Sequence, residues 1–205
     1  MILENWKMSY EGYSQIECKS PASMYSVLLE NNLIKDPFYG LNELELTKLS
    51  DKDTIFETEL YINEAEYQKN HIELVFLGLD TICDIYVNGT KIASTKNMHR
   101  RYVFDVKDLV RVGKNHIKLD FKSPTKYFEK MDKLHFLRTN GETILGAPHL
   151  RKALYMSGWD WGPTLPDMGI FRPVYLEYRE GLEIEDVYVR TDALDRFGAS
   201  IVAEY

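Results

Sequence analysis

The chain has 205 residues, which is enough to bury a hydrophobic core in one large domain, or in one domain and part of a second. Its 14 Tyr, 9 Phe and 3 Trp, within a hydrophobic fraction of 44%, exclude a disordered chain and favour strands over helices. A formal charge of -7 without a basic block excludes nucleic acid and anionic membrane as partners, and favours a neutral ligand.

The first half of the chain carries one helix signal and several strand signals. Residues 23–34 have apolar side chains at mixed three- and four-residue spacings, which predicts a short amphipathic helix. Residues 72–79 and 82–92 have strand composition, and Asn88-Gly89 between apolar runs predicts a β-hairpin. Alternating apolar residues in 102–106 and 117–121 predict further strands of a two-faced sheet.

The second half begins with a stretch that has no regular period. Residues 123–158 are interrupted by prolines and glycines, so we predict a long loop region, which in a compact domain is commonly a binding loop. Strand character returns in residues 170–178, 184–190 and 199–205. Because two strands cannot form an independent sandwich, we predict one domain over residues 1–181 and the truncated start of a second over 182–205.

The start of the chain lacks the positive and apolar segments of a signal peptide, and no apolar run is long enough to span a bilayer. We therefore expect Cys18 and Cys83 to be free thiols in a reducing cytoplasm. The five histidines show neither i,i+4 spacing nor neighbouring cysteine pairs, so we predict no metal and no cofactor.

One motif carries chemistry that suits a sugar. In the segment Gly158-Trp-Asp-Trp-Gly-Pro163, Trp159 and Trp161 flank Asp160 beside residues that force a turn. An indole face packs against the C–H groups of a pyranose, and a carboxylate accepts hydrogen bonds from two hydroxyls. Composition alone nevertheless favours a local hydrophobic plug over a sugar contact, so both interpretations stay open on this basis.

The wider context of this motif resembles a known family. The run from Leu150 to Leu176 closely resembles the corresponding run in β-mannosidases of glycoside hydrolase family two. The resemblance extends to Leu33–Glu43, Gly78–Gly89 and Asn97–Val106, and so covers most of residues 30 to 180. The segment Gly169–Val174 and the Asn88-Gly89 hairpin are shared with β-galactosidases and β-glucuronidases, whereas Trp-Asp-Trp-Gly-Pro points to mannose.

The resemblance implies an all-β fold, with an N-terminal jelly-roll β-sandwich of the galactose-binding-domain-like type followed by an immunoglobulin-like sandwich. A (β/α)8 barrel with two catalytic glutamates then completes family members, which are retaining enzymes. This chain ends before the barrel, so we expect no catalytic residue in it. Its expected partners are a β-mannoside sugar and the missing barrel and immunoglobulin-like domains of the same polypeptide.

The resemblance also implies the residues of a sugar subsite. Asp160 is the expected acceptor for non-reacting hydroxyls of a terminal mannose, with Trp159 or Trp161 as the wall of the pocket. Asn97 is a second candidate from the preceding loop. The remaining two candidates, Arg151 and Lys152, would orient Asp160 or meet the barrel, although solvated or interdomain charges explain them equally well.

The other carboxylates, among them Asp80, Asp84 and Asp105, are interpreted as turn or solvent-face residues without a role. Three alternatives to a β-mannosidase fragment remain. One is a purely structural interaction domain, in which Trp159 and Trp161 would both be buried under neighbouring strands; the other two keep a sugar as the ligand. The parent protein could be a β-galactosidase or β-glucuronidase, or the chain could be a stand-alone carbohydrate-binding module with the same jelly-roll fold.

Overall fold

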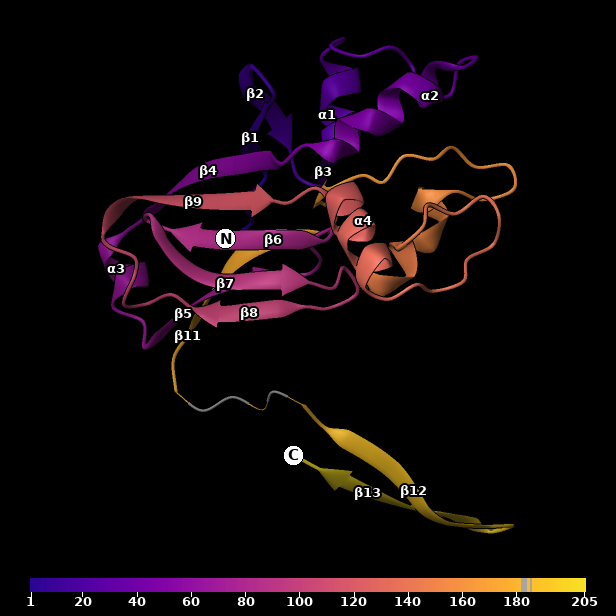
Figure 1. Cartoon of the computed structure of the whole chain (residues 1–205). Coiled ribbons are helices and arrows are strands. Elements are labelled where there is room, and N and C mark those ends of the chain that lie inside the picture. Colours follow the sequence, from indigo (N-terminus) through magenta and orange to yellow (C-terminus); the bar gives the residue numbers. More distant parts are fainter. Residues whose placement is uncertain (182–183, 185) are drawn as a thin grey trace.

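The computed structural model describes residues 1–181, 184 and 186–205, and within them the strands form two main antiparallel sheets (Figure 1). One sheet has the strand order β2-β1-β4-β9-β6-β7, and the other has the order β11-β5-β8. A short pair, β10-β3, and a separate hairpin, β12-β13, complete the pairing. The predicted all-β fold with two facing sheets is therefore confirmed.

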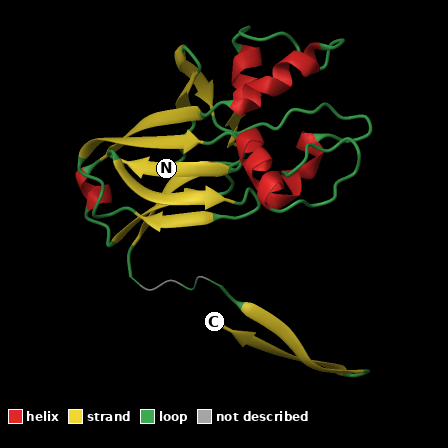
Figure 2. Cartoon of the chain, viewed as in Figure 1, coloured by secondary structure: helices red, strands yellow, loops and turns green. Residues whose placement is uncertain are grey.

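The strands are β1 (Asn5–Tyr10), β2 (Tyr13–Lys19), β3 (Ala22–Ser23), β4 (Thr54–Ile62), β5 (His71–Phe76), β6 (Ile82–Val87), β7 (Thr90–Lys96), β8 (Tyr102–Asp105), β9 (Gly113–Phe121), β10 (Gly169–Ile170), β11 (Val174–Arg179), β12 (Tyr188–Asp195) and β13 (Gly198–Glu204). The helices are α1 (Met24–Glu30), α2 (Asn42–Leu46), α3 (Glu64–Tyr67) and α4 (Pro124–Leu134), with 3-10 turns η1 (Thr47–Asp51), η2 (Ala147–His149) and η3 (Leu154–Ser157). Figure 2 shows how the helices α1, α2 and α4 gather at one end of the sandwich.

One hydrophobic core lies between the two main sheets. In β4 and β9 every second residue is buried, because successive side chains of a strand point to opposite faces. Phe56 of β4 and Phe121 of β9 meet edge to face, with ring centroids 5.7 Å apart. Leu74 of β5 and Leu176 of β11 close the same core from the second sheet.

The hairpin predicted at Asn88-Gly89 is confirmed as the β6–β7 connection. Asn88 and Gly89 both have positive φ, 49° and 83°, which is the backbone that a two-residue type I′ turn requires. The Asn88 side chain adds bonds that composition does not reveal. Its Oδ1 accepts from the backbone N–H of His116, and its Nδ2 donates to the carbonyl of Leu109.

The helix predicted in residues 23–34 is confirmed as α1. Its N-terminus is capped by Ser23, whose hydroxyl accepts from the backbone N–H of Ser26 at 3.3 Å. The loop predicted for residues 123–158 is wrong over its first third, which forms helix α4. Ser123 caps this helix at the backbone N–H of Lys126, Pro124 occupies its first turn, and the buried Phe128 anchors it.

The last two predicted strands are present as β12 and β13, which pair with each other in a hairpin. The predicted strand over residues 184–190 begins later, at Tyr188, and its Glu185 lies outside the described residues. The predicted domain start at residue 182 also lies outside them, so the division at 181 remains a prediction. No helix in the described part of the chain is long and apolar enough to cross a bilayer.

Gly169 gives a test of this packing, because β10 approaches β3 too closely for a side chain. A Cβ at Gly169 would lie 2.4 Å from the Ala22 carbonyl oxygen and 2.7 Å from the Ser23 Cα, and φ is +154°. We expect Gly169→Ala to lower the free energy of unfolding by about 1–3 kcal/mol, measured by urea denaturation. Gly141→Ala is the matched control, since a Cβ at Gly141 would meet nothing within 4 Å; equal stabilities of the two variants would contradict the prediction.

Candidate functional site

The Trp-Asp-Trp motif forms a tight exposed turn. The backbone N–H of Gly162 donates to the carbonyl of Trp159 at 3.1 Å, so Asp160 and Trp161 occupy the two central positions. Trp161 is 85% exposed and Trp159 is 46% exposed, and Asp160 is exposed between them. Within the described residues the Asp160 carboxylate has no hydrogen-bond or ion-pair partner. The hydrophobic-plug interpretation, which requires two buried indoles, is therefore wrong.

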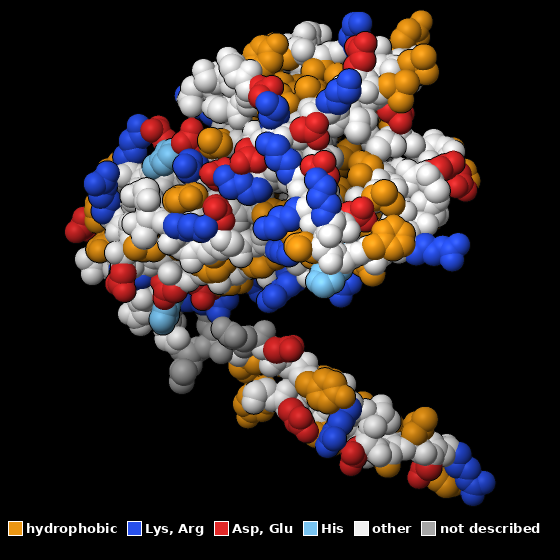
Figure 3. All heavy atoms as spheres, viewed as in Figure 1, with side chains coloured by type: hydrophobic (Ala, Val, Ile, Leu, Met, Phe, Trp, Pro, Cys, Tyr) orange, Lys and Arg blue, Asp and Glu red, His pale blue; other side chains and the backbone are white. Residues whose placement is uncertain are grey.

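The turn lies beside a mainly apolar hollow of about 610 Å³. Its lining includes Trp159, Trp161 and Tyr155 from the segment of the turn, and also Leu29 of α1 and Phe38 of the following loop. Aromatic rings with few polar groups are the usual walls of a small-molecule pocket. Figure 3 shows hydrophobic side chains gathered over the end of the molecule that carries α1 and α2. Asp160 is not among the lining residues and lies outside the hollow.

Asn97 and Arg151 are brought together by their backbones, but the structure does not place them in the hollow. The two residues form a parallel β-bridge, and the backbone N–H of Met98 donates to the Arg151 carbonyl at 3.0 Å. The Asn97 side chain accepts from the backbone N–H of His99 at 2.9 Å. The Arg151 residue is exposed. Their predicted contact with sugar remains a prediction.

Lys152 has a different environment from the one predicted. Its ammonium is buried and donates to the Asp80 carboxylate at 2.5 Å and to the Asp167 backbone carbonyl at 2.6 Å. It therefore neither pairs with Asp160 nor acts as a solvated charge. The interpretation of Asp80 as a turn or solvent-face residue is wrong, since Asp80 is 3% exposed and its carboxylate is the partner of Lys152. Asp105 is at the surface, where it pairs with His71.

The structural role of Asp167 is not predicted from the sequence, because a single acidic residue after a proline gives no local indication of its contacts. One carboxylate oxygen accepts from the backbone N–H of Tyr25 at 3.2 Å and from that of Met168 at 2.8 Å. Burial raises the pKa of the Asp167 carboxyl to about 6, against hydrogen bonds that lower it. Asp167 thereby joins the segment after the Trp-Asp-Trp turn to the first turn of α1, and both Asp167 and Tyr25 line the hollow.

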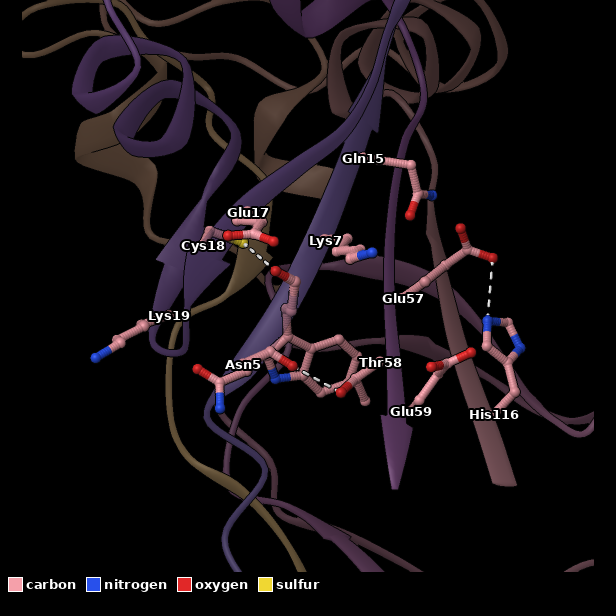
Figure 4. A pocket seen from close by; sticks show the side chains of 11 residues that line it. Asn5, Lys7, Gln15, Glu17, Cys18, Lys19, Glu57, Thr58, Glu59 and His116 are labelled. Carbon is pink, nitrogen blue, oxygen red and sulfur yellow. Dashed lines mark hydrogen bonds and ion pairs between the residues drawn. The ribbon is translucent and has the colours of Figure 1, made fainter. Parts of the chain in front are cut away.

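A second hollow, of about 550 Å³, lies between the β1–β2 hairpin and β4–β9 (Figure 4). β1 pairs with β4 only from Lys7 to Ser9; beyond this the strands separate, and the Thr58 hydroxyl donates to the Asn5 carbonyl instead. The polar side chains that line this second hollow include the Glu57–His116 pair, which Figure 4 marks with a dashed line.

This second hollow offers no exposed aromatic face. Its indole belongs to Trp6, which is 2% exposed and donates its ring N–H to the Leu3 carbonyl. A sugar could therefore form hydrogen bonds there but could not stack on a ring. Within the described residues, no three His, Cys, Asp or Glu side chains are grouped as a metal site would need. The Trp-Asp-Trp turn is the stronger candidate for sugar contact.

Comparisons with known proteins identify the family to which the chain belongs. The family model "Glycosyl hydrolase 2 galactose-binding domain-like" matches residues 6–172. The β-mannosidase of Rattus norvegicus is 34% identical over 187 residues, which cover 84% of this chain and 20% of that protein. β-Mannosidase B of Aspergillus terreus is 30% identical over 189 residues, which cover 89% of this chain and 22% of that protein. The chain thus spans about a fifth of the length of these curated relatives.

Solved structures give the same fold. The β-D-mannosidase from Dictyoglomus thermophilum superposes with a TM-score of 0.87 at 32% identity, over 98% of this chain and 25% of that chain. The exo-chitosanase CsxA of Amycolatopsis orientalis superposes with a TM-score of 0.65 at 20% identity, over 93% of this chain and 21% of that chain, which shows a shared fold alone. The resemblance seen in the sequence is confirmed by these matches.

The exposure of the two indoles can be measured by acrylamide quenching of tryptophan fluorescence. We expect Trp161→Phe to remove more of the quenchable emission than Trp159→Phe, because Trp161 is the more exposed. The double variant Trp159→Phe/Trp161→Phe retains only the buried Trp6 among the 3 tryptophans. Its Stern–Volmer constant should be several-fold lower than that of the unmodified chain. A constant that stayed as high would show that the turn is buried.

Proposed function

The chain belongs to the glycosyl hydrolase 2 galactose-binding domain-like family, and from this premise we propose that it is the non-catalytic N-terminal domain of a retaining exo-β-mannosidase. The proposed reaction is hydrolysis of terminal, non-reducing β-D-mannose residues. Support comes from relatives at 30–34% identity that carry the name β-mannosidase. The observation that supports this role is Asp160, which is exposed between two accessible indoles and has no side-chain partner in the described part of the chain.

The proposed division of labour follows from the chemistry of retaining glycosidases. Two carboxyl groups about 5 Å apart, one an acid/base and one a nucleophile, would lie in a barrel outside this chain. The present domain would hold sugar hydroxyls that do not react. Asp160 can accept hydrogen bonds from two hydroxyls at once, and Trp161 can cover a C–H face of the ring. Binding energy from such remote groups can position the sugar for attack and so raise the rate.

The surface beside the turn fits a docking face for that barrel. Phe38, Tyr39 and Leu41 are each at least 74% exposed on the loop before α2, and Tyr155 is 61% exposed near the turn. Contiguous exposed apolar side chains of this kind mark interaction sites. The proposed partner is the catalytic barrel of the same polypeptide. We also propose that β12 and β13 begin an immunoglobulin-like domain, since an isolated hairpin is at best marginally stable.

The alternatives are less well supported. The β-glucuronidase of an uncultured Clostridium species shares the fold at a TM-score of 0.64 but is only 18% identical. This likeness supports the architecture of the chain and gives no support for a glucuronide as its substrate. A stand-alone carbohydrate-binding module would need a complete sugar site within this chain. For the location of the protein we propose the cytoplasm, since Cys18 and Cys83 are free thiols, which reducing compartments favour.

The Asp160 assignment can be tested in the full-length polypeptide that contains this chain, once its reading frame beyond Tyr205 is known. We expect Asp160→Ala to lower kcat/KM for an aryl β-mannoside about 10- to 100-fold, because a charged hydrogen-bond acceptor for the sugar is lost. Asp105→Ala is a suitable control, because Asp105 is a surface carboxylate that pairs with His71. Wild-type turnover by the Asp160 variant would refute the substrate contact.

The stand-alone module can be distinguished by calorimetry on the present chain. If the chain contributes only part of a subsite, titration with mannose at millimolar concentration should give no saturable heat. Methyl β-galactoside is the comparison ligand, and it should behave in the same way. Saturable heat with mannose that disappears in the Asp160→Ala variant would instead support a complete binding module and count against the shared-subsite proposal.

A further inference from the structure

One side chain, that of Lys152, connects the two ends of the segment that carries the Trp-Asp-Trp turn. Lys152 precedes the turn and Asp167 follows it, and the Lys152 ammonium donates to the Asp167 carbonyl at 2.6 Å. Between these two residues the described structure contains the 3-10 turn η3 and no strand of either main sheet. The Lys152 side chain thus links the two ends of residues 152–167 directly.

The same ammonium also connects this segment to the sandwich. Its second acceptor is the Asp80 carboxylate at 2.5 Å, and the two side chains are only 2% and 4% exposed. The Asp80 backbone is itself fixed, since it exchanges hydrogen bonds of 2.9 and 2.7 Å with Gly169. Removing either charge would leave the other buried without its partner, which is strongly unfavourable.

Asp167 extends the connection to the other side of the apolar hollow. Its carboxylate accepts from the backbone N–H of Tyr25 in the first turn of α1, while its carbonyl accepts from Lys152. Tyr25 lines the same hollow as Trp159 and Trp161. The Trp-Asp-Trp segment and α1, which both contribute lining residues to the hollow, are therefore linked through Asp167 to the buried Lys152–Asp80 pair.

We infer that Lys152 is a positioning residue, which holds the Trp-Asp-Trp turn at a fixed place relative to α1 through its buried contacts with Asp80 and Asp167. Lys152 does not touch the proposed sugar position, and it acts through the backbone of the segment it closes. The consequence for sugar binding rests on the proposed function. The positioning itself does not, and it can be measured without any sugar.

Fluorine NMR of the chain labelled with 5-fluorotryptophan tests this inference, because the 3 tryptophans give one resonance each. Trp159 and Trp161 report on the turn, and the buried Trp6 in β1 reports on the sandwich. In Lys152→Met we expect the Trp159 and Trp161 resonances to shift or broaden while the Trp6 resonance stays in place. Lys114→Met is the matched control; it removes an exposed lysine paired with Glu59 and should move none of the three resonances.

The melting temperature of Lys152→Met should fall by roughly 6–20 °C, as expected for a broken buried ion pair.

Three unchanged resonances in a folded Lys152→Met would overturn the inference. Equal changes in all three would do the same, because they would show a general structural role. If Lys152→Met does not fold, Asp80→Asn is measured with the same criteria; failure of both variants to fold would also assign Lys152 a general structural role. An Asp160 variant with normal activity would refute the sugar contact and leave this result untouched.

Discussion

A charged amine inside a protein must be matched by a partner, because its transfer from water costs several kcal/mol even after the structure relaxes. Lys152 meets this requirement with the Asp80 carboxylate and the Asp167 carbonyl, and this condition fixes where the Trp-Asp-Trp segment can lie. Asp80 is in turn held by backbone bonds to Gly169, where β10 packs so closely on β3 that no Cβ fits. The exposed turn thus depends on a buried ion pair and on the close backbone packing beside it.

The features that sequence predicts well are those encoded within a few neighbouring residues. Asn88-Gly89 specifies a type I′ turn because both residues tolerate positive φ, and Ser23 caps α1 three residues before its partner. Helix α4 escapes prediction because Pro124, Gly141, Gly146 and Pro148 make residues 123–158 as a whole resemble a loop. Ser123-Pro124 is nevertheless a valid helix start, and residues 125–134 contain neither proline nor glycine. The local signal is present there, and the surrounding turn residues outweigh it.

Contacts between distant residues cannot be predicted in the same way. Lys152 and Asp80 are 72 positions apart, and no spacing rule connects an acid after a buried strand with a lysine in an irregular loop. Sequence reasoning therefore assigns Lys152 to the sugar site and gives Asp80 no role. The family resemblance locates the Trp-Asp-Trp motif, but its exposure becomes evident only with the folded chain, because composition alone favours buried indoles.

In the proposed function this domain holds sugar hydroxyls and a separate barrel performs the chemistry, so the Trp-Asp-Trp turn must keep a fixed position. Bond cleavage tolerates little displacement of the sugar, so a group that holds remote hydroxyls must be as fixed as the catalytic carboxylates. An exposed turn on a long segment does not meet this condition by itself, because loops are mobile unless their ends are tied. The buried Lys152–Asp80 pair supplies that constraint at the start of the segment, while Trp161 stays largely exposed and Asp160 has no side-chain partner within the described residues.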